Sequence, residues 1–226
     1  MILGKKISKA LSFVISLTLA LVICICSFEF SSNKIKANAA AAKIATLTIH
    51  SDPTGGHYGL PVGQHAFLSI RNKAGYDISV LGTNVPPNGA ITIGTTKSLD
   101  GQGDGIYTNA EAWLIKNKGY YKKRVSLSID ITLGELFKLN DVMYKNNTWS
   151  WYLNCSIFAR TVWNSVAPKS LELTGGTPVM LADSIKSKKT YKDAAKIGTC
   201  DKANVRRVKK ANKYAKIDMK KVMKNA

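Results

Sequence analysis

Cys155 is the residue of this sequence best placed to act as a nucleophile. It follows Asn154, a favourable helix N-cap residue, and apolar residues at helical spacing continue to Val166, shortly before Pro168. Cys155 therefore falls in the first turn of an expected helix. Unsatisfied N–H groups and the positive end of the helix dipole stabilise a thiolate there, so the pattern predicts a reactive thiol.

A cysteine nucleophile needs a general base, and the sequence contains three histidines. His50 ends an alternating strand pattern, where a solvated edge position is expected. His57 lies in a loop rich in glycine that would not hold it rigidly. His65 begins a second strand pattern, and the end of a strand can position a base well. Cys155 and His65 are therefore the candidate catalytic residues.

The acidic residues offer one metal-like pattern. Asp100, Asp104 and Glu111 share the spacing of positions one, five and twelve of a calcium-binding EF-hand loop. A strand-like segment precedes them where that motif needs a helix, so we expect a glycine-rich loop instead. The histidines and cysteines provide no close-spaced pair of zinc ligands. We expect no metal and no organic cofactor.

The N-terminus has the pattern of a secretory signal peptide. Lys5, Lys6 and Lys9 precede an apolar stretch over 10–28, and a polar stretch then ends in Ala-Asn-Ala at 37–39. About 18 apolar residues could also just span a bilayer, so an uncleaved transmembrane helix is the alternative. We expect cleavage after residue 39 and a secreted protein, extracellular or associated with the cell envelope.

In an exported chain, Cys155 has a second possible use. Only Cys155 and Cys200 remain after the leader, and two cysteines in an oxidising compartment commonly pair. From these residues alone, a Cys155–His65 site and a Cys155–Cys200 disulfide both remain open.

The net charge of +19 is unevenly distributed. Residues 1–39 carry +4, residues 40–185 carry thirteen basic and ten acidic side chains for +3, and residues 186–226 carry +12. A domain that reads nucleic acid should have its own basic face, and the central region lacks one. We therefore expect no specific nucleic-acid partner. The basic C-terminal extension (184–226) is expected to bind anionic polymers of the cell envelope.

The elements that must position the candidate residues follow from periodicity and capping. Thr132 and Glu135 form a capping-box pattern before a helix over 133–144. A short segment over 109–115 has helical character. Alternating or apolar patterns predict strands over 45–50, 65–71, 78–81, 90–95 and 125–131. The second to fourth of these strands would form an antiparallel meander. The expected fold class is α+β, with the antiparallel sheet packed on the helix that bears Cys155.

The C-terminal extension has a pattern of its own. Its apolar residues fall near one face of a helix, with lysines and arginines around them: Val205, Val208, Ala215, Met219 and Val222. A cationic amphipathic helix and a partly disordered tail are both consistent with this pattern. A third possibility is that Val205, Val208 and Met219 pack on the domain.

The segments Gly63–Ile70 (GQHAFLSI) and Asn154–Ala159 (NCSIFA) together resemble the circularly permuted branch of the NlpC-like papain superfamily. The lecithin–retinol acyltransferase group is a permuted relative. In this branch the histidine strand comes first and the cysteine helix later, and in this sequence the two motifs lie about 90 residues apart. The resemblance covers roughly residues 60–167 and leaves the extension unexplained.

The resemblance implies a papain-like fold in which Cys155 is the nucleophile and His65 the base. The family also uses a third polar residue to orient the imidazole, and the two motifs do not locate it. Thr83 and Asn84 would come opposite His65 if the chain over 65–82 were a simple hairpin. The backbone N–H of Cys155 is the expected oxyanion donor.

These observations define the expected organisation: a signal peptide over 1–39, a papain-like hydrolase domain over 40–183, and a helical or disordered basic extension over 184–226. The expected function is a secreted cysteine hydrolase of amide or peptide bonds. By resemblance, cell-wall peptides are the leading substrate, followed by a lipid ester or a protein. The alternative is a secreted non-catalytic binding protein with a Cys155–Cys200 disulfide and a tail that binds polyanions.

Overall fold

The alternating apolar residues predicted as strands form the centre of a sheet in the computed structural model, which describes residues 42–54, 64–99, 101–210 and 213–224. β1 (Lys43–Asp52) pairs antiparallel with β2 (His65–Asn72) on one side and with β7 (Val125–Thr132) on the other. The register places Ile49 opposite both Leu68 and Leu127. These three side chains are buried together, as the alternation predicts.

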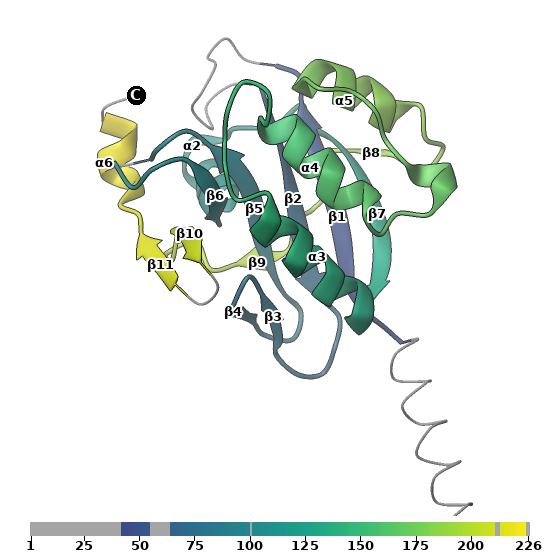
Figure 1. Ribbon diagram of the computed structural model, residues 1–226, viewed down its shortest axis with the longest axis horizontal. Helices are drawn as coiled ribbons and strands as arrows, with labels where there is room; N and C mark the ends of the chain where they lie inside the picture. Colours follow the sequence, from purple (N-terminus) through teal and green to yellow (C-terminus); the bar gives the residue numbers. More distant parts are fainter. Residues whose placement is uncertain (1–41, 55–63, 100, 211–212, 225–226) are drawn as a thin grey trace, which may run out of the picture. The chain divides into compact units, whose positions relative to one another are not determined.

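Within the described residues the sheet contains nine strands, eight of them in the order β11-β10-β6-β5-β2-β1-β7-β8, while β9 pairs in parallel with β5 (Figure 1). The remaining strands have these bounds: β5 (Gly89–Thr96), β6 (Gly105–Thr108), β8 (Lys192–Asp193), β9 (Thr199–Cys200), β10 (Arg206–Lys210) and β11 (Lys213–Lys216). All the other pairings in this sheet are antiparallel, which agrees with the expected α+β class.

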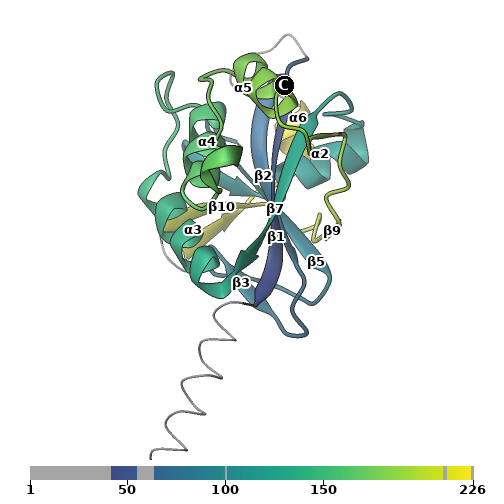
Figure 2. The same ribbon diagram turned by 90° about the vertical axis from the view of Figure 1, so that its right-hand side faces the viewer.

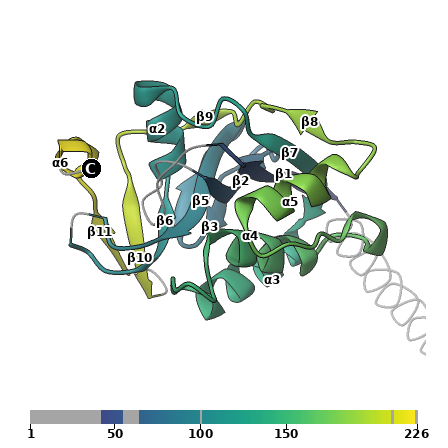
Figure 3. The same cartoon turned by 90° about the horizontal axis from the view of Figure 1, so that it is seen from above.

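Helices cover both faces of the sheet. Figures 2 and 3 show α3 (Leu133–Lys145), α4 (Cys155–Asn164) and α5 (Pro178–Lys186) on one face and α2 (Ala110–Lys118) on the other. The face under α3, α4 and α5 carries Ala66, Leu68 and Ile70 of β2, while Phe67 packs in a separate cluster with α2. β2 thus presents alternate residues to the two faces of the sheet, as a strand requires. A 3-10 turn, Lys169–Leu171, connects α4 to the segment before α5.

Side-chain caps fix where two of these helices begin. Thr132 Oγ1 accepts the N–H of Glu135 at 3.2 Å, and the Glu135 carboxylate accepts the N–H of Thr132 at 2.7 Å, which completes the predicted capping box. Asn154 Oδ1 accepts the N–H groups of Ser156 and Ile157 at 2.9 and 3.1 Å. α4 therefore begins at Cys155, as the sequence predicts.

The predicted meander is wrong in its middle strand. β3 (Ile78–Val80) pairs with β4 (Thr83–Val85) in a separate two-stranded sheet, and β2 pairs directly with β5. The Asn72 side-chain amide donates to the carbonyls of Tyr76 and Val85. These two hydrogen bonds hold together the two ends of the segment that contains β3 and β4. Thr83 and Asn84 are consequently not opposite His65. The residue that pairs with His65 is Asp52 of β1.

The C-terminal extension is neither one long helix nor a free tail. Its residues supply β8 to β11 and the short α6 (Met219–Lys224), and β10 extends the sheet by pairing with β6. The Arg207 guanidinium donates to the carbonyls of Gly103 and Asp104, and these hydrogen bonds hold β10 against the segment before β6. Because an unpaired edge at β6 would leave backbone N–H and C=O groups without partners, strand pairing overrides the helix-like spacing of the valines.

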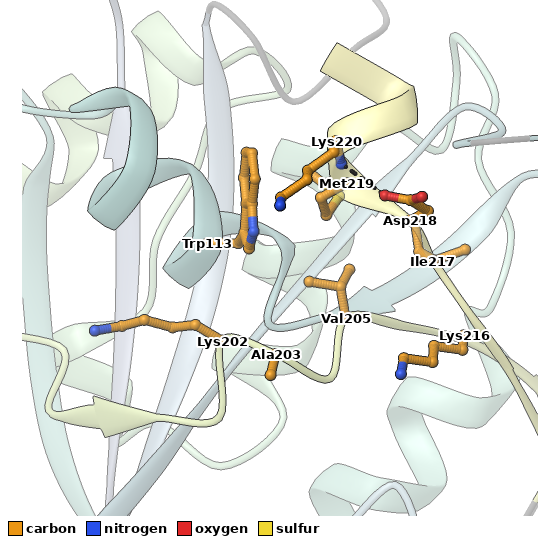
Figure 4. A pocket seen from close by; sticks show the side chains of 9 residues that line it. All are labelled: Trp113, Lys202, Ala203, Val205, Lys216, Ile217, Asp218, Met219 and Lys220. Atoms are coloured by element: carbon orange, nitrogen blue, oxygen red, sulfur yellow. Dashed lines mark hydrogen bonds between the residues drawn. The ribbon is translucent and has the colours of Figure 1, made fainter. Parts of the chain in front are cut away.

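The apolar residues of the extension pack on the domain, which was one of the three possibilities. Val205, Val208 and Met219 are all buried. Figure 4 shows Trp113 of α2 across from Val205, Ile217 and Met219, around a cavity of about 520 Å³. Residues Lys43–Ala226 form one compact unit, so no packing boundary follows Asp183.

The leader expected over 1–39 and the loop histidine His57 lie outside the described residues. No helix within the described ranges is long and apolar enough to cross a membrane.

Candidate active site

The thiol of Cys155 lies at the capped N-terminus of α4, in the wall of a cavity of about 360 Å³. The residue is 8% exposed, and the backbone N–H of Ala66 donates a hydrogen bond to its sulfur. The helix terminus and this N–H group both favour the thiolate form. The structure thus places Cys155 where the sequence predicts a reactive thiol.

His65, the first residue of β2, lies beside this thiol and is hydrogen-bonded to it. Its Nε2 atom is 3.0 Å from Oε1 of Glu111, the second residue of α2. The His65 and Glu111 side chains are 3% and 2% exposed, so the pair is almost completely removed from water. The imidazole therefore lies between a thiol and a carboxylate, an arrangement that can move a proton to and from the sulfur.

Electrostatics within this buried group favour an ion pair. Burial is the largest influence on His65 and alone would lower its pKa, but Cys155 and Glu111 together outweigh it and raise the pKa to about 10. Burial alone would likewise raise the pKa of the Cys155 thiol, yet the charge and the hydrogen bond of His65 lower it below its usual value. Each group therefore shifts the pKa of the other towards the thiolate and imidazolium forms.

Glu111 lies where a third polar residue could orient the imidazole, and sequence reasoning did not find it there. Residues 65 and 111 are 46 positions apart, and only the packing of α2 on the sheet brings them together. One local signal was available, because Glu111 stands between Ala110 and Ala112 and before Trp113, so its sequence neighbours are apolar. Thr83 and Asn84, the residues suggested for this role, lie in the separate β3–β4 hairpin.

A glycine of β5 makes room for the pair. A Cβ atom built at Gly94 would overlap Oε1 of Glu111 and would come within 2.9 Å of Nε2 of His65. Any side chain at residue 94 would therefore displace the carboxylate or the imidazole. Gly94 is a positioning residue for both.

Aromatic rings enclose the imidazole on its other sides. The ring centroids of Phe67 and Tyr121 lie 5.9 and 5.7 Å from that of His65, and 5.4 Å from each other. Phe67 and Tyr121 are themselves buried, which keeps water from the back of the imidazole. Such packing holds the ring in one orientation and strengthens its interaction with Glu111.

His50 is not the solvated edge residue that the sequence suggested. It is fully buried in β1, because β2 and β7 flank that strand on both sides. Its two ring nitrogens lie 2.8 Å from the Ser126 hydroxyl and 2.9 Å from that of Ser69. Burial, reinforced by the charge of Arg124, holds the pKa of His50 well below its ordinary value, so the ring is neutral.

Indole rings and small polar groups line the cavity in front of Cys155. Trp149 and Trp151 line it from the segment before α4, and Pro178 and Val179 from the start of α5. Trp151 is 64% exposed and forms part of the rim. The remaining lining residues are Gln64, His65, Thr95, Thr96, Asn154 and Thr177. This cavity, defined by these residues, is called the catalytic cavity below.

Cys155 and Cys200 are both free thiols. Cys200 lies on β9, in a small apolar cluster with Ala90 and Ala112, and burial raises the pKa of its thiol to about 12. Among the calcium-loop candidates, Asp104 accepts the N–H of Ser98, whereas Glu111 is engaged with His65. No group of three or more His, Cys, Asp or Glu side chains in the described part of the chain could hold a metal ion.

The comparisons with known proteins give no relative: no protein-family model, curated protein or solved structure matches this chain. The resemblance to the permuted NlpC-like branch accordingly rests on the two sequence motifs alone. The chemistry of the site must be argued from its own residues.

Proposed function

We propose that this chain is a cysteine hydrolase that cleaves amide or peptide bonds through an acyl-enzyme. One observation carries the proposal: buried His65 is hydrogen-bonded to the thiol of Cys155 and to the carboxylate of Glu111, beside an open cavity. A nucleophile, a base and a group that orients the base are the parts that thiol hydrolysis requires.

In the proposed mechanism the Cys155 thiolate attacks the substrate carbonyl carbon, and the carbonyl π electrons move to its oxygen. The tetrahedral intermediate collapses as His65 gives its proton to the departing amine, which leaves a thioester on Cys155. Neutral His65 then takes a proton from water, and the resulting hydroxide attacks the thioester. Release of the carboxylic acid returns the thiolate and the imidazolium.

Two donors at the catalytic cavity are suited to the oxyanion. The Asn154 cap uses the N–H groups of Ser156 and Ile157 and not that of Cys155, so the Cys155 N–H is our first donor. The Gln64 side chain lines the catalytic cavity and is our second. Loss of a single oxyanion donor commonly costs about 100-fold in turnover.

The substrate class, the fold family and the location are proposed together with the activity. We expect cell-wall peptides to be the leading substrate, with lipid esters and proteins as the next candidates. The order of the histidine strand before the cysteine helix supports a permuted papain-like packing. The leader pattern at 1–39 supports export to the cell surface.

Turnover of purified peptidoglycan fragments by the exported protein tests the proposal. Cys155→Ala should abolish cleavage, and His65→Ala should reduce turnover by about 100-fold or more, in line with general-base contributions. Cys200→Ser is the matched control and should retain full activity. Retained activity in Cys155→Ala would overturn the proposal. A native protein without a free thiol would instead support the non-catalytic binding protein.

A further inference from the structure

Lys97 holds a positive charge at the rim of the catalytic cavity. Its ammonium nitrogen lies 5.1 Å from the ring centroid of Trp149 and 5.3 Å from that of Trp151. The two indoles are themselves neighbours, with centroids 5.7 Å apart and planes inclined by 58°. Both rings line the cavity that contains Cys155. The faces of the rings attract a cation, so they fix where this charge lies.

Among the described residues that line the cavity, none carries a carboxylate that would compete for the charge of Lys97. Apart from the catalytic His65 and Cys155, the residues that line the cavity are neutral. In the described part of the chain, Lys97 takes part in none of the ion pairs. The charge of Lys97 is therefore not neutralised by a carboxylate of the described residues, and it can attract an anionic group that enters the cavity.

A second feature also points to a ligand in this cavity. The hydroxyl of Thr95 is buried and has no hydrogen-bond partner among the described residues, yet Thr95 lines the cavity. A buried hydroxyl without a partner is costly, and a bound polar group would supply the missing hydrogen bond. The exposed indole of Trp151 adds an apolar surface beside it.

From this arrangement we propose that the site selects acyl substrates that carry a negatively charged group, a carboxylate or a phosphate, and that Lys97 is the residue that recognises it. This inference rests on the proposed function, since it names the class of substrate for the same site. The anionic group would lie near Trp149 and Trp151, and the carbonyl would lie at Cys155. A substrate with a cationic group in the same position would be repelled.

Two alkylating reagents of nearly equal size test this selection without requiring turnover. Iodoacetate carries a carboxylate and iodoacetamide a carboxamide, and both alkylate a thiolate by forming an S–C bond while iodide leaves. The measured quantity is the ratio of their second-order rate constants at Cys155, in a Cys200→Ser background. His65 favours iodoacetate in every variant, so a change in the ratio between variants reports on Lys97.

Lys97→Gln should lower the iodoacetate-to-iodoacetamide ratio by about three- to tenfold, as expected for the loss of one unit charge at the rim of the catalytic cavity. The rate with iodoacetamide should stay within about twofold, because the thiolate itself is untouched. Lys97→Arg should keep the wild-type ratio, since it retains the cation over the indoles. Lys138→Gln is the matched control: it removes one exposed lysine from α3 and should leave the ratio unchanged. Added salt should reduce the wild-type ratio towards that of Lys97→Gln.

A ratio that is equal in the wild type and in Lys97→Gln would overturn the inference, as would an equal loss of rate with both reagents. Paired peptides ending in a carboxylate or a carboxamide extend the test to substrates, where kcat/KM should favour the carboxylate only while Lys97 or an arginine is present. The two proposals fail separately. A lysine-dependent ratio without peptide cleavage contradicts the hydrolase, whereas cleavage without that dependence contradicts anion selection.

Discussion

Oε1 of Glu111 lies 3.0 Å from Nε2 of His65, and both atoms lie over the backbone of Gly94. The contact joins a helix on one face of the sheet to the first residue of a central strand. Because the Glu111 carboxylate is hydrogen-bonded to Nε2 of His65, the other ring nitrogen, Nδ1, is left to exchange a proton with Cys155. Glu111 is thus a positioning residue whose hydrogen bond and charge also stabilise the imidazolium.

Replacement of Glu111 by glutamine should separate its charge from its hydrogen bond. Glu111→Gln keeps an acceptor oxygen but removes a charge that raises the pKa of His65. We expect kcat/KM to fall by at least about tenfold. The alkaline limb of its pH profile, which reports loss of the imidazolium, should move to lower pH. Cys155 and Tyr121 also face the ring and are unchanged in this variant.

Glu172→Gln provides the matched control for this experiment. Glu172 makes an exposed ion pair with Lys169, and its loss should alter neither the rate nor the pH profile. If Glu111→Gln shifted stability alone and left the alkaline limb in place, Glu111 would have only a structural role.

Gly94→Ala should disable the site with little change elsewhere. The added Cβ atom would overlap the carboxylate of Glu111 and crowd Nε2 of His65. We expect at least a tenfold loss of kcat/KM together with a destabilisation of about 1–3 kcal/mol from overpacking. Gly75→Ala is a suitable control, because a Cβ at Gly75 meets nothing within 4 Å. Crystallography of Gly94→Ala should show His65 or Glu111 displaced, and an undisturbed pair would contradict this account.

The parts of the fold that could be predicted are those encoded by short-range pattern. Strict alternation around Leu47 and Leu127 identifies the central strands, and the Thr132 and Asn154 caps locate the helix starts within one residue. These signals are local, since side-chain period and capping depend on neighbours in the sequence. Cys155 and His65 lie on such elements, so their positions could be predicted as well.

The features that were missed depend on pairing between distant segments. Glu111 reaches His65 only because α2 packs across β5, and nothing near residue 65 specifies that contact. Val205 and Val208 have the three-residue spacing of a helix, yet the chain between them pairs with the edge of β6 through Arg206 and Arg207. His50 resembles the end of an edge strand because β7 arrives 75 residues later in the sequence.

The two free thiols should differ sharply in reactivity. The pKa of Cys155 is lowered by His65, whereas burial raises that of Cys200 to about 12. At pH 6–7 a larger fraction of Cys155 than of Cys200 should therefore be thiolate, so iodoacetamide should label Cys155 faster. Mass spectrometry of peptides from timed alkylation measures both rates in one sample. Equal rates in the folded protein would show that the Cys155 thiolate is not stabilised.

His50 should make the protein sensitive to mild acid. Its pKa is lowered in the folded state by burial and by Arg124, and its ring faces only the neutral Ser69, Ser126 and Phe67. As the pH falls below about 6.5, His50 binds a proton in the unfolded chain but not in the folded chain. The free energy of unfolding therefore falls by up to about 1.4 kcal/mol per pH unit. His65 opposes this slope near pH 6.5, because its raised pKa keeps it protonated in the folded state while the same ring still titrates in the unfolded chain. Well below about pH 6.5 it is protonated in both states and adds no slope.

Thermal unfolding between pH 7 and 5 measures this effect. His50→Ala should be less stable than the wild type at pH 7 by about 2–4 kcal/mol, because it leaves a cavity and two unpaired hydroxyls. It should also show a flatter dependence on pH over this interval. A wild-type melting temperature that stays constant from pH 6.5 to 5 would argue that His50 is already protonated in the folded protein.

The final prediction concerns residues 184–226, which are expected to bind anionic envelope polymers as a folded surface and not as a tether. Val205, Ile217 and Met219 cover apolar residues of α2 and the sheet, so a chain that ends at Asp183 would expose that cluster. We expect such a chain to aggregate or to melt at a clearly lower temperature, and to lose activity on small substrates. Substitution of surface lysines is therefore the informative experiment.

Lys209, Lys213 and Lys216 are exposed on β10 and β11, and none of them forms an ion pair within the described ranges. Their triple replacement by glutamine should leave the melting temperature and turnover unchanged but weaken retention on phosphocellulose and on isolated cell envelopes. Wild-type retention should fall steeply with salt, because such attraction is screened beyond about 8–10 Å at physiological ionic strength. The matched control replaces the exposed Lys118, Lys123 and Lys138, which lie outside the extension. Equal loss of retention in both triple variants would mean that net charge, and not the β10–β11 surface, governs binding.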